Sequence, residues 1–179
     1  MNFNPDVHRR RSIRLQDYNY TRGGAYFVTI CTYDRESLFG AVSDGVMRLN
    51  RFGEIVREEW LITDELRDYA VLDEFMVMPN HFHAVLMIDE RRGTACRAPT
   101  VESFGCPVAG SLPTIIRSFK SAATKRINIL RDNSGGPVWQ RNYYDRVIRD
   151  EPELDSIRQY ITDNPVKWEE DENHPEKWR

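Results

Sequence analysis

The stretch "AVLDEFMVMPNHFHAVLMID", from Ala70 to Asp89, predicts two β-strands joined by a sharp junction. Both halves are strongly apolar, whereas the proline and Asn80 between them favour a turn. Residues two apart on a strand point to the same face of a sheet. His81 and His83 are therefore expected to project side by side, while Phe82 points the other way, into the core.

Other segments supply the remaining elements of one domain. "GAYFVTICT" (Gly24 to Thr32) and "YYDRVIR" (Tyr143 to Arg149) predict strands, and an Asp-Gly turn at 44–45 separates two short extended pieces. Amphipathic helices are expected to begin after Asn50, Ser111 and Asp150, and Pro165 ends the last one. The order strand, helix, strand, strand, helix, strand, helix predicts an α+β fold. We expect a ferredoxin-like or RRM-like antiparallel sheet with helices packed on one side.

Composition is typical of a globular protein and argues against a membrane-spanning protein and a cysteine-based metal site. The 179 residues are 40% hydrophobic and 30% charged, which is ordinary for one globular domain. No apolar run approaches the roughly 20 residues that a membrane helix needs. Three cysteines without a C-x-x-C spacing indicate a reducing, cytoplasmic setting and no cysteine-based metal site.

The net charge of −3 hides a segregation of charge along the chain. Residues 150–179 hold ten acidic and four basic side chains, so the rest of the chain is net positive. Two stretches, Arg9 to Arg22 and Ser111 to Arg131, are the most basic. We expect a basic arm at 1–23, one domain at 24–168 and an acidic tail at 169–179. Because phosphate attraction is local, the basic stretches permit a nucleic-acid site, although solvated surface arginines explain them equally well.

The two histidines have the spacing of two ligands to one metal ion, but a third ligand must come from elsewhere. The last helix offers Tyr160 and Asn164, which lie four residues apart on one helix face. Taken singly, these residues are ordinary: strand histidines, a tyrosine at the edge of a core, and an asparagine that ends a helix. Only their combination points to a site.

Five motifs together resemble a known family: "GAYFVTICT", "VMPNHFHAVLMI", "RSFKSAATKRIN", "VWQRNYYDRVIRDE" and "IRQYITDNPVKW". In this order they are similar to the IS200-like single-tyrosine transposases, and most of all to the REP-associated tyrosine transposases. The resemblance runs from about Arg9 to Trp168. His81-Phe82-His83 fits the histidine–hydrophobe–histidine (HUH) signature of these nucleases. Two departures are Arg146, where many relatives have histidine, and a long loop from Arg91 to Gly110.

The resemblance implies an activity and a site. Tyr160 corresponds to the catalytic nucleophile, and His81, His83 and Asn164 correspond to the ligands of a divalent metal ion, Mg²⁺ or Mn²⁺. The expected reaction is cleavage and rejoining of single-stranded DNA beside short hairpins through a 5′-phosphotyrosine link, without a membrane partner. The expected DNA-backbone contacts are Arg9, Arg10, Arg11, Arg14, Arg117, Lys120 and Lys125.

Two other functions remain open from the sequence. One is a nucleic-acid-binding regulator that has the fold without catalysis. The other is a hydrolytic metalloenzyme that uses the two histidines and a water molecule, with no need for Tyr160. We expect a monomer, with a homodimer as the alternative, because relatives in mobile elements exchange tyrosine helices between subunits whereas domesticated ones act alone.

Overall fold

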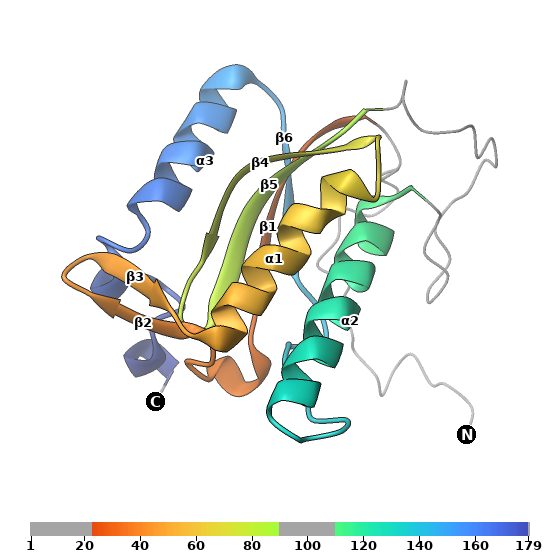
Figure 1. Cartoon of the computed structure of the whole chain (residues 1–179). Helices are drawn as coiled ribbons and strands as arrows, with labels where there is room; N and C mark the ends of the chain where they lie inside the picture. Colours follow the sequence, from red (N-terminus) through yellow and green to blue (C-terminus); the bar gives the residue numbers. More distant parts are fainter. Residues whose placement is uncertain (1–22, 90–109, 179) are drawn as a thin grey trace, which may run out of the picture.

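A single antiparallel sheet organises the protein (Figure 1). The structure, a computed structural model, describes residues 23–89 and 110–178. The strands lie in the order β4-β5-β1-β6, in which β1 is Gly24–Cys31, β4 is Ala70–Val77, β5 is His81–Ile88 and β6 is Tyr144–Ile148. The helices are α1 (Arg51–Glu65), α2 (Leu112–Leu130) and α3 (Glu151–Asp163). The predicted α+β class, with helices packed on an antiparallel sheet, is confirmed.

The helices cover both faces of the sheet, which differs from the expectation of one covered side. Helices α1 and α2 lie on one face, and α3 lies on the other (Figure 1). The reason is visible in β5, where every residue except Met87 is buried, so both of its faces are apolar enough to need cover. Phe82, Ala84 and Leu86 belong to the core under α1 and α2, while Val85 belongs to the core under α3.

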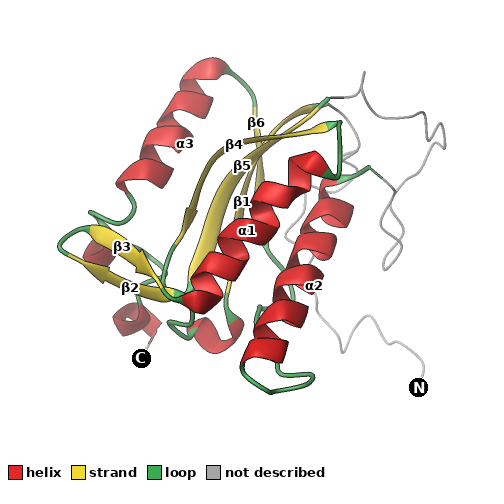
Figure 2. Cartoon of the chain, in the orientation of Figure 1, coloured by secondary structure: helices red, strands yellow, loops and turns green. Residues whose placement is uncertain are grey.

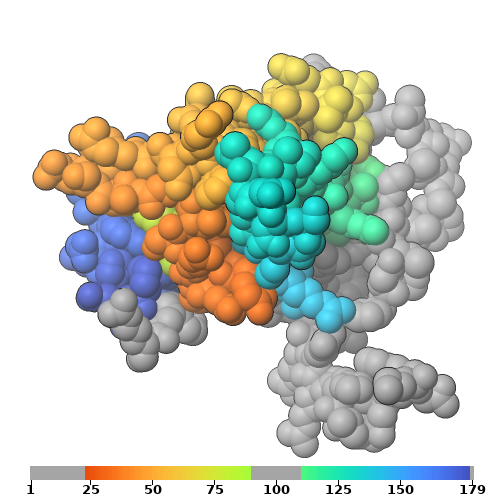
Figure 3. Space-filling model, turned by 60° about the horizontal axis from the view of Figure 1, so that its bottom comes forward, coloured from red at the N-terminus to blue at the C-terminus, as the bar shows by residue number. Residues whose placement is uncertain are grey.

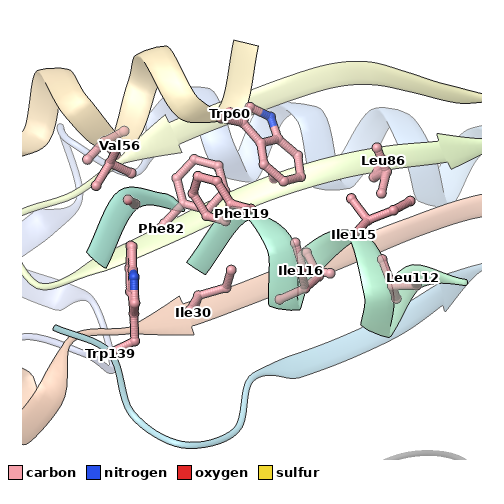
Figure 4. Packing of buried hydrophobic residues seen from close by; sticks show 14 of the residues in the cluster. Ile30, Val56, Trp60, Phe82, Leu86, Leu112, Ile115, Ile116, Phe119 and Trp139 are labelled. Atoms are coloured by element: carbon pink, nitrogen blue, oxygen red, sulfur yellow. The ribbon is translucent and has the colours of Figure 1, made fainter. Parts of the chain in front are cut away.

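The larger core is built around three aromatic rings that converge between α1, α2 and the sheet (Figure 4). The ring centroids of Trp60, Phe82 and Phe119 lie 5.0 to 5.2 Å apart in each pair. Trp60 and Phe82 are fully buried, and Phe119 is nearly so. This cluster fixes which way β5 faces and therefore which face carries the histidines.

Replacing Phe82 by alanine is expected to lower the free energy of unfolding by about 3–5 kcal/mol. The substitution removes the packing of this ring against both other rings and leaves a cavity between three elements. Urea unfolding followed by circular dichroism measures the change. Leu66→Ala is the matched control, because Leu66 is 70% exposed and should change stability by less than about 0.5 kcal/mol. A similar loss of stability in both variants would contradict this assignment of the core.

Helix α3 is held against the sheet by apolar packing and by one ion pair. Leu154, Ile157 and Ile161 pack on the face that carries Phe27 and Val85. In addition, both oxygens of the Asp73 carboxylate accept hydrogen bonds from the Arg158 guanidinium, at 2.8 and 2.7 Å. Asp73 lies at an irregularity of β4, so this two-bond contact joins the middle of α3 to the sheet edge.

Local signals in the sequence set the element boundaries (Figure 2). The Asn50 side chain accepts hydrogen bonds from the first turn of α1, and the Asp150 side chain accepts one from Glu153 at the start of α3. The carboxylate of Glu153 in turn accepts a bond from the backbone of Arg149, one residue before the N-cap position that a standard capping box would use. The Asp-Gly turn joins the short hairpin of β2 (Gly40–Ser43) and β3 (Val46–Leu49).

Three short 3-10 helices complete the described chain. They are η1 (Tyr33–Arg35), η2 (Trp168–Glu170) and η3 (Pro175–Trp178). The segment that follows α3 lies below the end of the sheet where β5 begins (Figure 1). Across the described ranges, no helix has the length and apolar character needed to span a bilayer. The expected basic arm and the Arg91 to Gly110 loop fall outside the described residues, apart from the end residues Gly23 and Gly110.

Candidate active site

The histidine pair lies at the start of β5, on the face covered by α3. His81 and His83 are both buried, and their ring centroids are 4.4 Å apart. Antiparallel pairing with β1 places His81 opposite Cys31 and His83 opposite Thr29. The predicted projection of both rings to one face is therefore what the structure has.

His81 has one ring nitrogen whose lone pair is available to bind a cation. Its Nδ1 atom lies 2.9 Å from the Asn80 side-chain oxygen. Its Nε2 atom is buried and has no hydrogen-bond partner within the described part of the chain. Burial lowers the pKa of His81 to about 3, although the nearby Asn164 side chain acts in the opposite direction. The ring is therefore neutral at pH 7, with a lone pair available for a cation.

His83 is held in place by three neighbours. Its Nδ1 atom is 2.8 Å from the Thr29 hydroxyl, and its ring stacks on Phe27 with centroids 5.3 Å apart. Burial, and then the adjacent His81, hold the pKa of His83 well below its usual value. The Nε2 atom faces the hydroxyl of Tyr160 at 3.4 Å. The remaining ring nitrogen of His83 is thus directed at the predicted nucleophile.

Tyr160 projects from α3 over the histidines while remaining open to a substrate. Its side chain is 38% exposed, and its ring meets Phe27 and His83 edge-on. Burial raises the pKa of the Tyr160 hydroxyl, and the negative charges of Asp171 and Glu172 raise it further. The phenol therefore stays protonated at neutral pH unless a positive charge enters the site.

Asn164 follows α3 and faces the same centre. Its amide nitrogen donates to the Asp171 carboxylate at 2.8 Å, whereas its side-chain oxygen is buried and finds no partner among the residues placed by the structure. Asp171 is only 7% exposed, and its second oxygen accepts a bond from the Asn173 backbone at 2.6 Å. Asp171 is a candidate site residue that the sequence reasoning missed.

A cavity of about 740 Å³ opens beside these groups. It is lined by the predicted residues His83, Tyr160 and Asn164, by the tyrosines of "NYYD", and by Arg146, which pairs with Glu153. Strand β6 begins at Tyr144, one residue later than expected, and Tyr144 is 48% exposed. Arg146 takes a place on the cavity wall where the family resemblance led us to expect histidine.

The predicted DNA-binding residues are placed differently from one another. Arg117 and Lys125 are exposed on α2, whose later, teal-coloured part lies near the centre of the face in Figure 3. The Lys120 ammonium instead donates to the carbonyls of Gln140, Arg141 and Asn142, at 2.7 to 3.5 Å, and burial lowers its pKa to about 8. Arg9, Arg10, Arg11 and Arg14 lie outside the described residues.

Comparison with known proteins places this geometry in a family. No protein-family model matches the chain. An uncharacterized protein of Haemophilus influenzae is 39% identical over 175 residues, which cover 95% of this chain and 96% of that protein. The two chains belong to one family. A second protein of the same organism, named "Putative REP-associated tyrosine transposase", is 26% identical over 149 residues, covering 83% of this chain and 74% of its own length.

A solved structure has a similar fold. It is that of a REP-associated tyrosine transposase bound to a REP hairpin, and it superimposes with a TM-score of 0.58. The match covers 87% of this chain and 74% of that one, at 17% identity. The chain has the fold of a REP-associated tyrosine transposase. The resemblance to REP-associated tyrosine transposases inferred from the five motifs is therefore confirmed.

On this transposase fold, the histidines and the carboxylate of Asp171 form a cluster that fits a divalent cation. One ligand atom from each of His81, His83 and Asp171 lies within 4.8 Å of the others, and all three residues are buried. The unpartnered atoms, Nε2 of His81 and the side-chain oxygen of Asn164, are electron-pair donors. Two imidazole nitrogens with two oxygens form a mixed donor set, which suits Mn²⁺ better than Mg²⁺ because Mg²⁺ prefers oxygen ligands.

Proposed function

We propose that this protein is a metal-dependent strand transferase that cleaves single-stranded DNA near hairpins through a 5′-phosphotyrosine intermediate. One observation carries the proposal: the Tyr160 hydroxyl lies 3.4 Å from Nε2 of His83, beside a buried cluster that fits a metal ion, in a cavity open to a substrate. Hairpin DNA is proposed as the partner because the fold relative was solved with a REP hairpin. A DNA substrate agrees with the cytoplasmic location expected from the cysteines.

His81, His83 and Asn164 would hold the cation, with Asp171 as a fourth donor. When bound, a divalent cation neutralises charge on the scissile phosphate and lowers the pKa of a neighbouring hydroxyl. Neutral histidines leave that positive charge undiminished, whereas Asp171 offsets part of it. The raised pKa of Tyr160 means that the phenol is a poor nucleophile until the site is loaded.

The chemical step balances without a cofactor beyond the cation. The Tyr160 oxygen loses its proton and forms a bond to phosphorus, and the bond from phosphorus to the 3′ oxygen breaks. The 3′ oxygen takes up a proton and leaves as a hydroxyl, while the 5′ phosphate stays on the tyrosine. Since one phosphodiester replaces another, a 3′ hydroxyl of DNA can reverse the step without nucleotide hydrolysis.

The deciding experiment uses single-stranded oligonucleotides that carry a fixed stem-loop and randomised flanks, with Mn²⁺ or Mg²⁺, analysed on denaturing gels. We expect a covalent species that retains a 3′-end label but not a 5′-end label, and that EDTA abolishes. Peptide mass spectrometry is expected to find the phosphate on Tyr160. Cleavage without an adduct would favour the hydrolytic enzyme, and binding without cleavage would favour the regulator.

The exposed basic residues of α2 are proposed to contact the DNA backbone. Arg117→Gln combined with Lys125→Gln is expected to leave folding intact, because exposed charges contribute little to stability. DNA affinity should fall, and the slope of log K against log salt should flatten by about one unit for each phosphate that the protein no longer neutralises. Gel shifts at several salt concentrations measure both quantities.

The matched control for this pair is Arg51→Gln with Arg57→Gln, which removes the same charge from exposed positions of α1. An equal loss of affinity in both double variants would mean that net charge, and not the α2 surface, attracts the DNA. Unchanged affinity in the α2 variant would leave the expected arm, Arg9 to Arg14, as the backbone contact. Lys120 is kept in place because its ammonium holds the 140–142 backbone.

We further propose that the monomer is the active unit. Tyr160 reaches the histidines of its own chain, and the Arg158–Asp73 contact holds α3 to the same sheet. Light scattering at working concentration should give the mass of one chain. A protein that is active only as a dimer would contradict this proposal.

A further inference from the structure

Asn80 is a fully buried side chain at the junction between β4 and β5, directly before the histidine pair. Its amide nitrogen donates to two backbone carbonyls, that of Arg35 at 3.2 Å and that of Asn173 at 2.8 Å. Its side-chain oxygen faces Nδ1 of His81 at 2.9 Å. Each of the two polar ends of this amide therefore has its own set of partners.

These partners leave one orientation for the amide. A carbonyl oxygen only accepts hydrogen bonds, so the end of Asn80 that meets two carbonyls must be the NH₂ group. The other end, which meets His81, is then the oxygen, which also only accepts. Nδ1 of His81 must therefore carry the ring proton, and Nε2 must carry the lone pair. The Nε2 atom is the buried one that lacks a partner in the described structure.

We propose that Asn80 is a positioning residue that fixes the tautomer of His81, so that its Nε2 lone pair faces the cation. Only the presence of a cation rests on the proposed function, because the orientation of the Asn80 amide follows from its own hydrogen bonds. The carbonyl of Asn173 is part of the device, since it helps to exclude the flipped amide. The segment after α3 is distant from β5 in the sequence. Through the Asn173 carbonyl it nevertheless helps to set the tautomer of His81, a proposed metal ligand on β5.

The tautomer is measured directly in the wild-type protein without metal. Two-dimensional ¹⁵N–¹H NMR of histidine rings distinguishes a protonated Nδ1 from a protonated Nε2. We expect His81 to show the Nδ1–H form alone at pH 7. A wild-type spectrum with the proton on Nε2 overturns the proposal, whatever the variants do.

Asn80→Ala is expected to give a mixture of tautomers at His81 and to weaken Mn²⁺ binding by about 10–100-fold, the usual effect of removing such a partner. Calorimetric titration with Mn²⁺, in the absence of DNA, measures the affinity. Asn80→Asp keeps the acceptor for His81 but places oxygen against two carbonyls. The Asn80→Asp variant should preserve the Nδ1–H form of His81 better than the Asn80→Ala variant does.

The matched control is Asn128→Ala. Asn128 lies on α2, and its buried side chain donates a hydrogen bond to the carbonyl of Gly136. The Asn128→Ala variant should leave the His81 tautomer and the Mn²⁺ affinity unchanged. An Asn80→Ala protein with the wild-type tautomer and affinity within about twofold would overturn the proposal, since such a partner normally contributes at least tenfold. Because neither readout involves DNA, absence of strand cleavage would count against the proposed function alone.

Discussion

Tyr160→Phe is expected to remove the covalent protein–DNA adduct completely and to lower strand cleavage by at least about 10³-fold, as loss of a nucleophile does elsewhere. The substitution deletes one oxygen and keeps the ring that packs edge-on against Phe27 and His83. Folding and DNA affinity should therefore stay at wild-type levels. Denaturing gels for the adduct, together with gel shifts for binding, separate these effects.

Substitutions of two other tyrosines test whether the effect is specific to Tyr160. Tyr33→Phe is the control, because Tyr33 is 47% exposed on η1 and is not one of the residues that line the cavity. Tyr144, like its neighbour Tyr143, lines the cavity with Tyr160, and its exposed side chain makes it a competing candidate for the nucleophile. An adduct that survives in Tyr160→Phe and disappears in Tyr144→Phe would show that the wrong tyrosine has been assigned.

His81→Ala and His83→Ala are each expected to lower cleavage by more than about 100-fold, since even residues that only support a metal ligand cost 10–100-fold. DNA affinity should change by less than about threefold, because the proposed backbone contacts are exposed cations and the histidines are buried. Mn²⁺ titration should show that metal binding falls in parallel with cleavage. An equal decrease in DNA affinity and cleavage would contradict this division of roles.

His174→Ala is the control for the two histidine variants. His174 lies in the segment after α3 and packs against Trp168, whose ring is 5.9 Å from that of His81. It is absent from the ligand cluster found in the described residues. Retained Mn²⁺ binding in this variant would show that the effect is specific to the β5 pair and is not a general result of removing a histidine.

The sequence predicted the strands, the helices and the side-by-side histidines because these depend on local periodicity and turn chemistry. It did not predict the side of the sheet that α3 covers. An apolar strand such as β5 is compatible with cover on one face or on both, and the choice depends on how α3 returns to Asp73 and the sheet.

Two site features depend on contacts that a sequence pattern does not contain. Asp171 lies in a run of acidic residues typical of a solvated tail, yet the amide of Asn164 and the backbone of Asn173 bury its carboxylate beside the histidines. Lys120 has the helical spacing of an exposed cation, yet the chain at 140–142 folds over it. Both results come from tertiary packing between segments that are distant in the sequence or follow a turn.

The distance along the sequence between the two halves of the site has a consequence during synthesis. His83 meets Tyr160 across 77 positions, and Asn80 meets Asn173 across 93. At translation rates of roughly 5–20 residues per second, a nascent chain carries its histidine pair for about 5–20 s before the later residues emerge. During that interval the chain lacks both Tyr160 and the Asn173 carbonyl that holds the Asn80 amide. Under the proposed function, a nascent chain is therefore inactive toward DNA until the residues after α3 have been synthesised.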